Sequence, residues 1–321
     1  MTFHSGYCSV IGRPNVGKST LLNELIGEKI SIISNKPQTT RNTIQLIYTD
    51  DRMQVVFLDT PGVQIPKNEL GEAMLKVSKD ALDGVDICLF VTDTSKTMGP
   101  LDHKILDELK KLKETPIILI LNKVDSLYDA LPEDEEAGPS ESYRPKLREG
   151  QTAEDYLNKL IEAYEGLGIF HSIIPLSAKK GQNIDQLKEA IYNLLPEGPM
   201  YFPDDMITDR SERFVVSEII REKCLNNMSD EIPHGIYVAV DAMKMRENGK
   251  MMDVQATIFV EKESHKGMVI GKGGKMLGLI GKQARLEIER FMDTRINLKL
   301  WVKVEKNWRK QKKKVKRFGY E

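Results

Sequence analysis

The chain has 321 residues, a length that predicts about two domains of roughly 100–200 residues each. Hydrophobic residues make up 40% and charged residues 30%, which fits a globular protein, and no apolar run approaches the roughly 20 residues needed to span a bilayer. The net charge of −1 hides an asymmetry, because residues 1–200 carry 22 Lys and Arg against 30 Asp and Glu, whereas residues 201–321 carry 25 against 18. The basic second part suggests a polyanionic partner, although a solvated charged tail gives the same count.

The start of the chain lacks the basic and small-residue pattern of a signal peptide, so we expect a cytoplasmic protein. Cys8, Cys88 and Cys224 are far apart and are expected to be buried apolar residues in a reducing compartment. The five histidines are scattered, so no zinc site is expected.

Short apolar runs alternate with helical patterns as far as residue 196. The expected strands are residues 7–12, 43–49, 53–59, 86–93, 116–122 and 172–177. Several are uninterrupted Val, Ile and Leu runs, which is typical of strands covered on both faces. We therefore expect an α/β domain with a mostly parallel sheet over residues 1–195. Residues 126–155 are acidic and contain three prolines, so they predict a surface insertion whose role stays open.

The first motif, "GRPNVGKS", fits the phosphate-binding pattern GxxxxGKS/T between an expected strand and an expected helix. Such a loop turns its backbone N–H groups toward phosphate at the positive end of the helix. Lys18 is expected to reach the β- and γ-phosphates and Ser19 to bind Mg²⁺. The nucleotide-binding residues predicted here are Gly12, Arg13, Pro14, Asn15, Val16, Gly17, Lys18 and Ser19.

Three further motifs lie at the ends of expected strands, and two of them are expected to recognise guanine. In "NKVD", Asp125 can accept hydrogen bonds from N1–H and the exocyclic amine of guanine, a donor pair that adenine lacks. "SAK" is expected to complete the base pocket, and "DTPG" to supply a water-mediated Mg²⁺ contact and a backbone N–H to the γ-phosphate. Four such motifs in order predict a Ras-like domain that binds GTP and GDP and hydrolyses GTP. The nucleotide-binding residues predicted from these three motifs are Asp59, Thr60, Pro61, Gly62, Asn122, Lys123, Asp125, Ser177, Ala178 and Lys179.

Two positions bear on hydrolysis. "QTTRN" (38–42) lies where a switch segment is expected, and we favour Thr40 over Thr39 as the residue that binds Mg²⁺ when γ-phosphate is present. Val63 stands where many GTPases have a glutamine that orients water, so Lys18, Thr40, Asp59 and Gly62 are the expected catalytic set and intrinsic hydrolysis should be slow. Asn15 resembles the asparagine of GTPases that bind K⁺ beside the phosphates, which implies K⁺ as a second cofactor.

The second half predicts a smaller α+β domain over residues 211–305. Residues 196–210 are proline-rich and predict a linker. A helix (211–225), two strands joined near Asn248-Gly249, two helices, of which the second is long (275–292), and a last alternating strand give the order α-β-β-α-α-β. The loop between the last two helices fits the GxxG of a KH domain, which clamps single-stranded nucleic acid. Its expected RNA-binding residues are Gly271, Lys272, Gly273, Gly274 and Lys275.

The basic tail (306–321) contains Trp308, Phe318 and Tyr320. Aromatic residues among cations can stack on bases, but they can equally cap the core of the domain, and the sequence does not decide between these roles. Trp301, which alternates away from the buried face of the last strand, leaves the same choice open.

The motifs "GRPNVGKS", "QTTRN", "DTPG", "NKVD" and "SAK", followed by "VIGKGGKMLGLIGKQARLEIERF", together resemble the Era family of bacterial GTPases over nearly the whole chain. Only residues 126–155 depart from that pattern. The resemblance implies a Ras-like P-loop domain with Mg²⁺, a type II KH domain, binding to the 3′ end of 16S rRNA, assistance to 30S subunit assembly and association with the inner membrane. We expect GTP to gate RNA capture and no DNA to be bound. The alternative function is a membrane-surface regulatory GTPase that uses the basic tail; an RNA-modifying GTPase lacks support from any catalytic cysteine or cofactor motif.

Overall fold

The computed structural model describes residues 2–34, 36, 38–94, 98–128, 147, 151–228 and 232–320. The chain forms two compact units. The first consists of Met1–Ser31, Thr40–Ile65 and Leu75–Asp209, and the second of Ile32–Thr39, Pro66–Met74 and Arg210–Glu321. The second unit therefore contains two short segments from the first half of the sequence as well as the C-terminal part.

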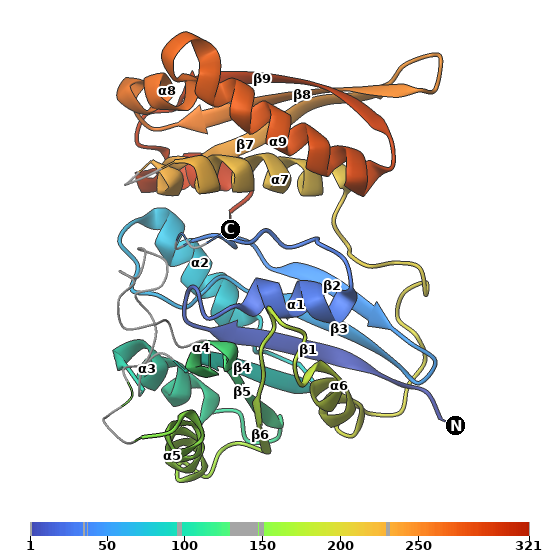
Figure 1. The fold of residues 1–321 in the computed structure, drawn as a ribbon, viewed down its shortest axis with the longest axis vertical. Coiled ribbons are helices and arrows are strands. Elements are labelled where there is room, and N and C mark those ends of the chain that lie inside the picture. Colours follow the sequence, from blue (N-terminus) through green and yellow to red (C-terminus); the bar gives the residue numbers. More distant parts are fainter. Residues whose placement is uncertain are drawn as a thin grey trace. The chain divides into compact units, whose positions relative to one another are not determined.

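The first unit is built on a six-stranded sheet in the order β2-β3-β1-β4-β5-β6 (Figure 1). Only β2 runs antiparallel to its neighbour, so the mostly parallel sheet expected from the sequence is confirmed. The strands are β1 (His4–Gly12), β2 (Ile44–Thr49), β3 (Met53–Asp59), β4 (Ile87–Asp93), β5 (Ile117–Asn122) and β6 (Ser172–Pro175).

Helices cover both faces of this sheet, and every residue of β4 and β5 is buried as a result. Phe90 and Leu119 pack on one face against α3 and α5, whereas α1 and α6 lie on the other (Figure 1). The helices of the first half of the chain are α1 (Lys18–Ile26), α2 (Glu69–Asp80), α3 (Pro100–Leu109), α4 (Asp125–Tyr128), α5 (Ala153–Glu165) and α6 (Ile184–Tyr192).

The expected surface insertion, residues 126–155, lies mostly outside the described residues. Its two ends are helical, because α4 runs to Tyr128 and α5 starts at Ala153. Thr152 caps α5, with its hydroxyl accepting a hydrogen bond from Asp155 N at 3.0 Å. Leu127 is buried. The described ends of the segment are therefore part of the folded unit, which the polar composition did not predict.

The proline-rich linker is bound along the sheet of the first unit. Gln54 of β3 is fully buried, and its side-chain amide donates to Phe202 O at 2.9 Å. Its carbonyl oxygen accepts from the backbone N–H groups of Tyr201 and Phe202 at 2.7 and 2.9 Å. Further along, Ile47 N donates to Ile207 O at 3.0 Å. Residues 196–209 therefore belong to the first unit, and the division between the units falls after Asp209.

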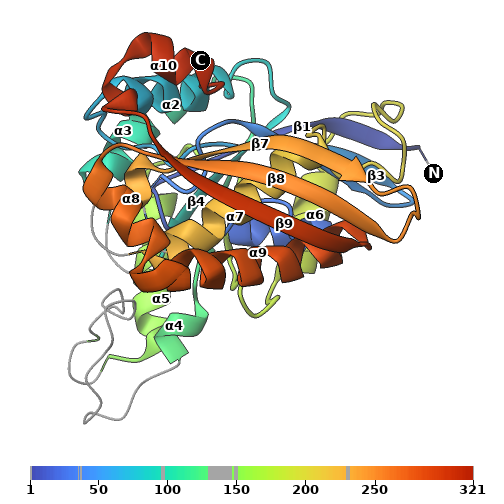
Figure 2. The ribbon, with the colours of Figure 1, turned by 90° about the horizontal axis from the view of Figure 1, so that it is seen from above.

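The second unit has the predicted order α-β-β-α-α-β. Its three-stranded sheet has the order β7-β8-β9, in which β8 pairs antiparallel with β7 and parallel with β9. Helices α7 and α9 lie on one face of this sheet, and Figure 2 looks onto the opposite face. The elements are α7 (Glu212–Asn227), β7 (Tyr237–Met245), β8 (Met251–Val260), α8 (Glu263–Ile270), α9 (Lys275–Met292), β9 (Arg295–Val304) and α10 (Lys312–Arg317).

The aromatic residues of the tail fill a core. Trp308 is fully buried and its indole N–H donates to Gly235 O at 2.9 Å. Phe318 stacks on Tyr237 with 4.0 Å between ring centroids. Tyr320 is also buried in this cluster, which includes Leu70, Met74 and Val315. Burial of these rings settles the choice left open by the sequence, since a base cannot stack on them in this conformation.

Candidate functional site

The phosphate-binding motif forms the loop between β1 and α1. Lys18, the first residue of α1, is buried and its Nζ donates to Gly12 O at 3.1 Å and to Arg13 O at 3.0 Å. Burial lowers the pKa of Lys18 to about 8, although the negative charge of Asp59 opposes the shift. A phosphate placed here would favour the protonated amine, so the loop is built for an anion.

The "DTPG" loop touches the phosphate loop. A side chain at Gly62 would place Cβ only 2.7 Å from Pro14 N, so glycine is required for this close approach. Val63 N donates to Gly12 O at 3.0 Å, and the Val63 side chain packs against the core of the first unit. Val63 therefore fixes the loop but offers no polar group to an attacking water.

Thr60 and Pro61 attach the same loop to its surroundings. The Thr60 hydroxyl is buried and donates to Val10 O of β1 at 2.6 Å. Pro61 O accepts a hydrogen bond from the Ser78 hydroxyl of α2 at 2.8 Å. These two contacts position the backbone of the loop.

Three oxygen-bearing side chains gather beside the start of α1. Ser19 Oγ lies 3.1 Å from Thr40 Oγ1 and 3.1 Å from Asp59 Oδ2. Asp59 Oδ1 is buried and has no hydrogen-bond partner of good geometry among the described residues. Burial raises the pKa of the Asp59 carboxyl above its usual value, with Lys18 acting in the opposite direction.

This cluster fits Mg²⁺, a hard cation that takes oxygen ligands and keeps several waters. Ser19 and Thr40 would hold the ion, with Asp59 acting through a water, and the ion would neutralise charge on the β- and γ-phosphates. The Thr39 hydroxyl instead donates to Lys36 O at 2.6 Å within its own segment. The geometry favours Thr40 as the ligand, and the choice between the two residues stays a prediction.

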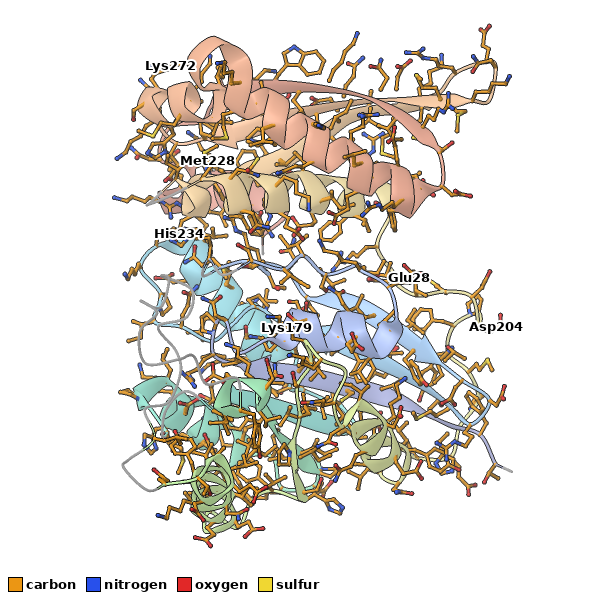
Figure 3. The ribbon with its side chains drawn as sticks, in the orientation of Figure 1. Glu28, Lys179, Asp204, Met228, His234 and Lys272 are labelled. Atoms are coloured by element: carbon orange, nitrogen blue, oxygen red, sulfur yellow. The ribbon has the colours of Figure 1, made fainter. Side chains whose placement is uncertain are left out.

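The base-recognition motifs meet at the ends of β5 and β6. Asn122 donates from Nδ2 to Val16 O at 2.8 Å, and its Oδ1 accepts from Ala178 N at 3.0 Å. The Ser177 hydroxyl donates to Asp125 Oδ1 at 2.6 Å, which orients the carboxylate and leaves its second oxygen for the guanine edge. Lys179, the last residue of "SAK", is exposed and is labelled in Figure 3.

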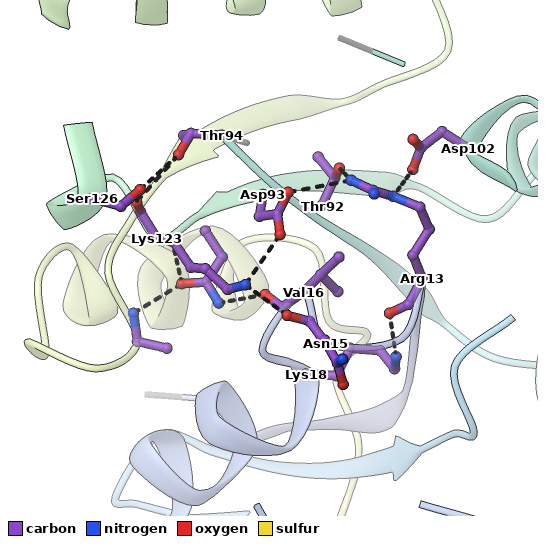
Figure 4. Close-up of polar contacts among 12 residues, drawn as sticks. Arg13, Asn15, Val16, Lys18, Thr92, Asp93, Thr94, Asp102, Lys123 and Ser126 are labelled. Atoms are coloured by element: carbon purple, nitrogen blue, oxygen red, sulfur yellow. Dashed lines mark hydrogen bonds and ion pairs between the residues drawn. The ribbon is translucent and has the colours of Figure 1, made fainter. Parts of the chain in front are cut away.

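A charge network connects the phosphate loop to β4, α3 and the "NKVD" motif (Figure 4). Arg13 donates from Nε to Asp102 Oδ1 at 2.7 Å, and Arg13 Nη2 lies 3.3 Å from Asp93 Oδ1. Lys123 Nζ donates to Asp93 Oδ2 at 3.1 Å and to Asn15 O at 2.6 Å. The guanidinium of Arg13, expected to help bind nucleotide, is thus directed at two acids, and it supports the loop.

Asp93 and Asp102 were not identified from the sequence as parts of the site. Asp93 is the last residue of the strand predicted at 86–93, and an acid at the carboxyl end of a parallel strand is a signal that could have found it. Asp102 also caps α3, because its Oδ2 accepts from Gly99 N at 2.9 Å. No local sequence pattern relates Asp102 to Arg13.

In the second unit Lys272–Gly274 of the "GKGG" motif form one short turn between α8 and α9. Gly271, Gly273 and Gly274 have φ angles of +72°, +57° and +76°, which glycine adopts without strain. Lys272, labelled in Figure 3, and Lys275 are both exposed. The turn therefore offers backbone and two cations to a phosphate chain.

A groove continues from this turn between α9 and β9. Leu298 and Leu300 of β9 contribute apolar side chains, and Gly278 and Gly281 leave the facing side of α9 without bulk. Glycine inside a helix is destabilising by roughly 1 kcal/mol, and here it keeps the groove open. The other lining residues are Gly274, Leu277, Lys282 and Arg285.

Among the described helices, none is both long enough and apolar enough to cross a bilayer.

Comparison with known families gives a match in each half of the chain. Residues 7–123 match the family described as 50S ribosome-binding GTPase. Residues 231–309 match the KH domain family. The two matches agree with the nucleotide site of the first unit and with the α-β-β-α-α-β order of the second.

Full-length relatives share both parts. The chain is 50% identical to GTPase Era of Clostridioides difficile, with 99% of each chain covered, and 48% identical to GTPase Era of Alkaliphilus metalliredigens over the whole of both chains. Two solved structures match with a TM-score of 0.87, 36% identity and 99% coverage of each chain. One is Era in complex with MgGDPNP and nucleotides 1506–1542 of 16S ribosomal RNA, and the other is an Era variant from Aquifex aeolicus bound to GDP·AlF4⁻. This chain, with its P-loop G domain and C-terminal KH domain, belongs to the Era family of GTPases and hydrolyses GTP.

Proposed function

We propose that this GTPase binds the 3′ end of 16S rRNA in the groove between α9 and β9 and assists assembly of the 30S subunit. The observation that carries the proposal is the "GKGG" turn, which opens onto that groove. The relative that was solved with a 16S rRNA segment covers 99% of this chain and supports the choice of RNA.

The chemistry of the groove suits single-stranded RNA. Lys272 and Lys275 are exposed beside the turn and would neutralise phosphates, while the backbone of the turn approaches the RNA chain closely. Leu298 and Leu300 would contact the faces of unpaired bases. Double-stranded nucleic acid does not expose those faces, which favours a single strand.

The substitution Gly273→Asp tests this proposal. The carboxylate would stand next to the RNA phosphates on a backbone with φ +57°, so we expect RNA affinity to fall more than tenfold at fixed salt while GDP affinity is unchanged. The matched control is Gly249→Asp in the turn between β7 and β8, because Gly249 has φ +65° and, like Gly273, open space around it. Fluorescence anisotropy with a labelled 16S 3′-end oligonucleotide measures the RNA, and isothermal titration calorimetry the GDP.

Equal losses of RNA affinity in the two variants would contradict the proposal, as would a loss of GDP affinity in Gly273→Asp.

For the assembly role, cells that carry only the Gly273→Asp protein should accumulate immature 30S particles in sucrose gradients. We place the protein in the cytoplasm. If it bound anionic vesicles through its tail and no RNA, the membrane-surface alternative would replace this proposal.

We also propose that K⁺ stimulates hydrolysis through Asn15. Asn15 lies in the phosphate loop with φ +64°, and Lys123 holds its carbonyl. We expect faster GTP hydrolysis in K⁺ than in Na⁺, and an Asn15→Ala variant that has lost the difference. Asn183→Ala is the control, since Asn183 also has a positive φ, +61°, so alanine meets the same backbone strain. Phosphate-release assays in the two salts measure the effect; equal wild-type rates would remove K⁺ from the mechanism.

A further inference from the structure

One strand of the second unit has an unusual outer face. In β9 the side chains alternate, so that Ile296 and Val302 are buried while Lys299, Trp301 and Lys303 are exposed on the other side. Trp301 is 44% exposed, whereas Trp308, the second of the two tryptophans of the chain, is fully buried. The outer face of β9 therefore presents an aromatic ring between two cations. We call these three residues the β9 stripe.

The β9 stripe is continuous with the groove. β9 is the edge strand of the sheet β7-β8-β9. Its inward residues Leu298 and Leu300 line the groove, and they alternate along the strand with the residues of the stripe. In Figure 2 the strand runs along the side of the sheet next to α9. A polymer that leaves the groove across this edge needs to pass only the thickness of one strand to reach Trp301.

The charges select the partner. Lys299 and Lys303 flank the ring along the strand, and residues 201–321 carry 25 Lys and Arg against 18 Asp and Glu. An exposed indole between lysines suits a chain that alternates flat bases with phosphates, because every base has a face that can stack. An apolar protein segment would bury the ring but leave the two ammonium groups without partners.

We infer that RNA nucleotides flanking those held in the groove cross the edge of β9, with a base stacked on Trp301 and phosphates next to Lys299 and Lys303. The inference rests on the proposed function and extends it, because it lengthens the RNA site beyond the four or so nucleotides that a KH groove clamps. The ligand class is single-stranded RNA long enough to fill the groove and cross this edge.

Two RNAs of shared sequence test the inference: a four-nucleotide RNA that fills only the groove, and a ten-nucleotide RNA that extends it at both ends. We expect Trp301→Ala to weaken the ten-nucleotide RNA by ~5–150-fold and to leave the four-nucleotide RNA unchanged, and Trp301→Phe to retain most of the affinity. Met245→Ala, which removes a comparably exposed side chain from β7, is the control and should change neither affinity.

Tryptophan emission gives a second measurement. Since Trp308 is buried, the ten-nucleotide RNA should quench the emission of Trp301 in the wild type, and this quenching should disappear in Trp301→Phe although the RNA still binds. Replacing Lys299 or Lys303 by Gln should lower the log–log salt slope by about 0.7 each for the long RNA alone.

The outcomes separate this inference from the proposed function. If the four-nucleotide RNA binds and Trp301→Ala leaves the long RNA unaffected, the inference is wrong and the groove function stands. Equal weakening of both RNAs by Trp301→Ala would indicate a structural role for the ring and would also overturn the inference. If neither RNA binds the wild type, both proposals fail. If Trp301→Ala lost the binding to anionic vesicles that the wild type shows, while its RNA binding was unchanged, the β9 stripe would be assigned to lipid instead.

Discussion

Asp93 holds together two cations that both reach the phosphate loop. Its two carboxylate oxygens lie 3.3 Å from the Arg13 guanidinium and 3.1 Å from Lys123 Nζ, and its side chain is only 6% exposed. Lys123 in turn holds the carbonyl of Asn15. Removing the charge of Asp93 would leave the two cations without the acid that they share, so the loop should lose its prearranged shape.

We therefore expect Asp93→Asn to weaken GDP and GTP by about tenfold each, with little change in the ratio of the two affinities, because the loss of a charge-assisted hydrogen bond is worth roughly 1.5 kcal/mol or more. Calorimetry with GDP and a non-hydrolysable GTP analogue measures this. Asp80→Asn is the control, since Asp80 is exposed and its carboxylate lies 3.9 Å from Lys76. A variant that unfolds more easily but binds nucleotide normally would show that the network serves stability alone.

The residues of this network also show where sequence reasoning stopped. The pattern "GRPNVGKS" predicted a loop in which the backbone and Lys18 face phosphate, and in the structure Lys18 Nζ donates to the loop carbonyls Gly12 O and Arg13 O. The pattern could not give the direction of Arg13, because its partner Asp102 is 89 residues away and belongs to a helix cap. Long-range ion pairs leave no local periodicity, so only the folded chain reveals them.

At the scale of elements, the strands and long helices were predicted well because burial dictates their composition. The helix expected at 275–292 is found at Lys275–Met292, and the strand expected at 53–59 is found at Met53–Asp59. Both have strong periodic or continuous apolar patterns, which are the most reliable signals in a sequence. Strand ends differed by up to three residues, as at His4, where pairing with Met53 of β3 extends β1 beyond its apolar run.

The linker was the element whose environment the sequence described least well. Three prolines excluded a regular helix, which is correct, but composition could not show that the segment is bound to a sheet. That binding depends on Gln54, a polar side chain with no exposed surface, whose amide makes three hydrogen bonds to residues 201–202. In the sequence, a buried glutamine whose amide is hydrogen-bonded to distant backbone groups cannot be distinguished from any other glutamine in a strand.

The tail shows the same limit for aromatic residues. Trp301 and Trp308 both stand among lysines, so composition treats them alike, yet one is exposed and the other is at the centre of a core. Strand alternation in β9 correctly separated Trp301 from the buried face. Residues 306–321 have no comparable alternation of apolar and polar residues, and their aromatic rings pack against Tyr237 and Phe259 of the sheet.

At the scale of the whole molecule, we expect two glycine-containing loops to bind two different phosphate ligands. The loop before α1 lies between a strand and a helix, next to the side-chain oxygens that would bind Mg²⁺ with a nucleotide. The turn before α9 lies at the end of a groove that a polymer can enter. If the nucleotide site and the RNA site are linked, the RNA affinity of the GTP-bound protein must differ from that of the GDP-bound protein. We expect Thr40 to produce that difference, because its hydroxyl lies 3.1 Å from Ser19 Oγ and would bind Mg²⁺ when γ-phosphate is present.

The pair Thr40→Ala and Thr39→Ala tests this linkage with two adjacent, chemically identical changes. For the wild type we expect RNA affinity to differ by ~5–150-fold between the GDP state and the state with a non-hydrolysable GTP analogue. Thr40→Ala should remove that difference and slow hydrolysis while leaving GDP affinity intact, because GDP has no γ-phosphate for the switch to sense. Thr39→Ala should keep the difference, since the Thr39 hydroxyl bonds only to carbonyls of its own segment in the described structure. RNA anisotropy in each nucleotide state measures both variants. The reverse result would move the metal ligand to Thr39, and loss in neither variant would mean that the threonine switch does not control RNA binding.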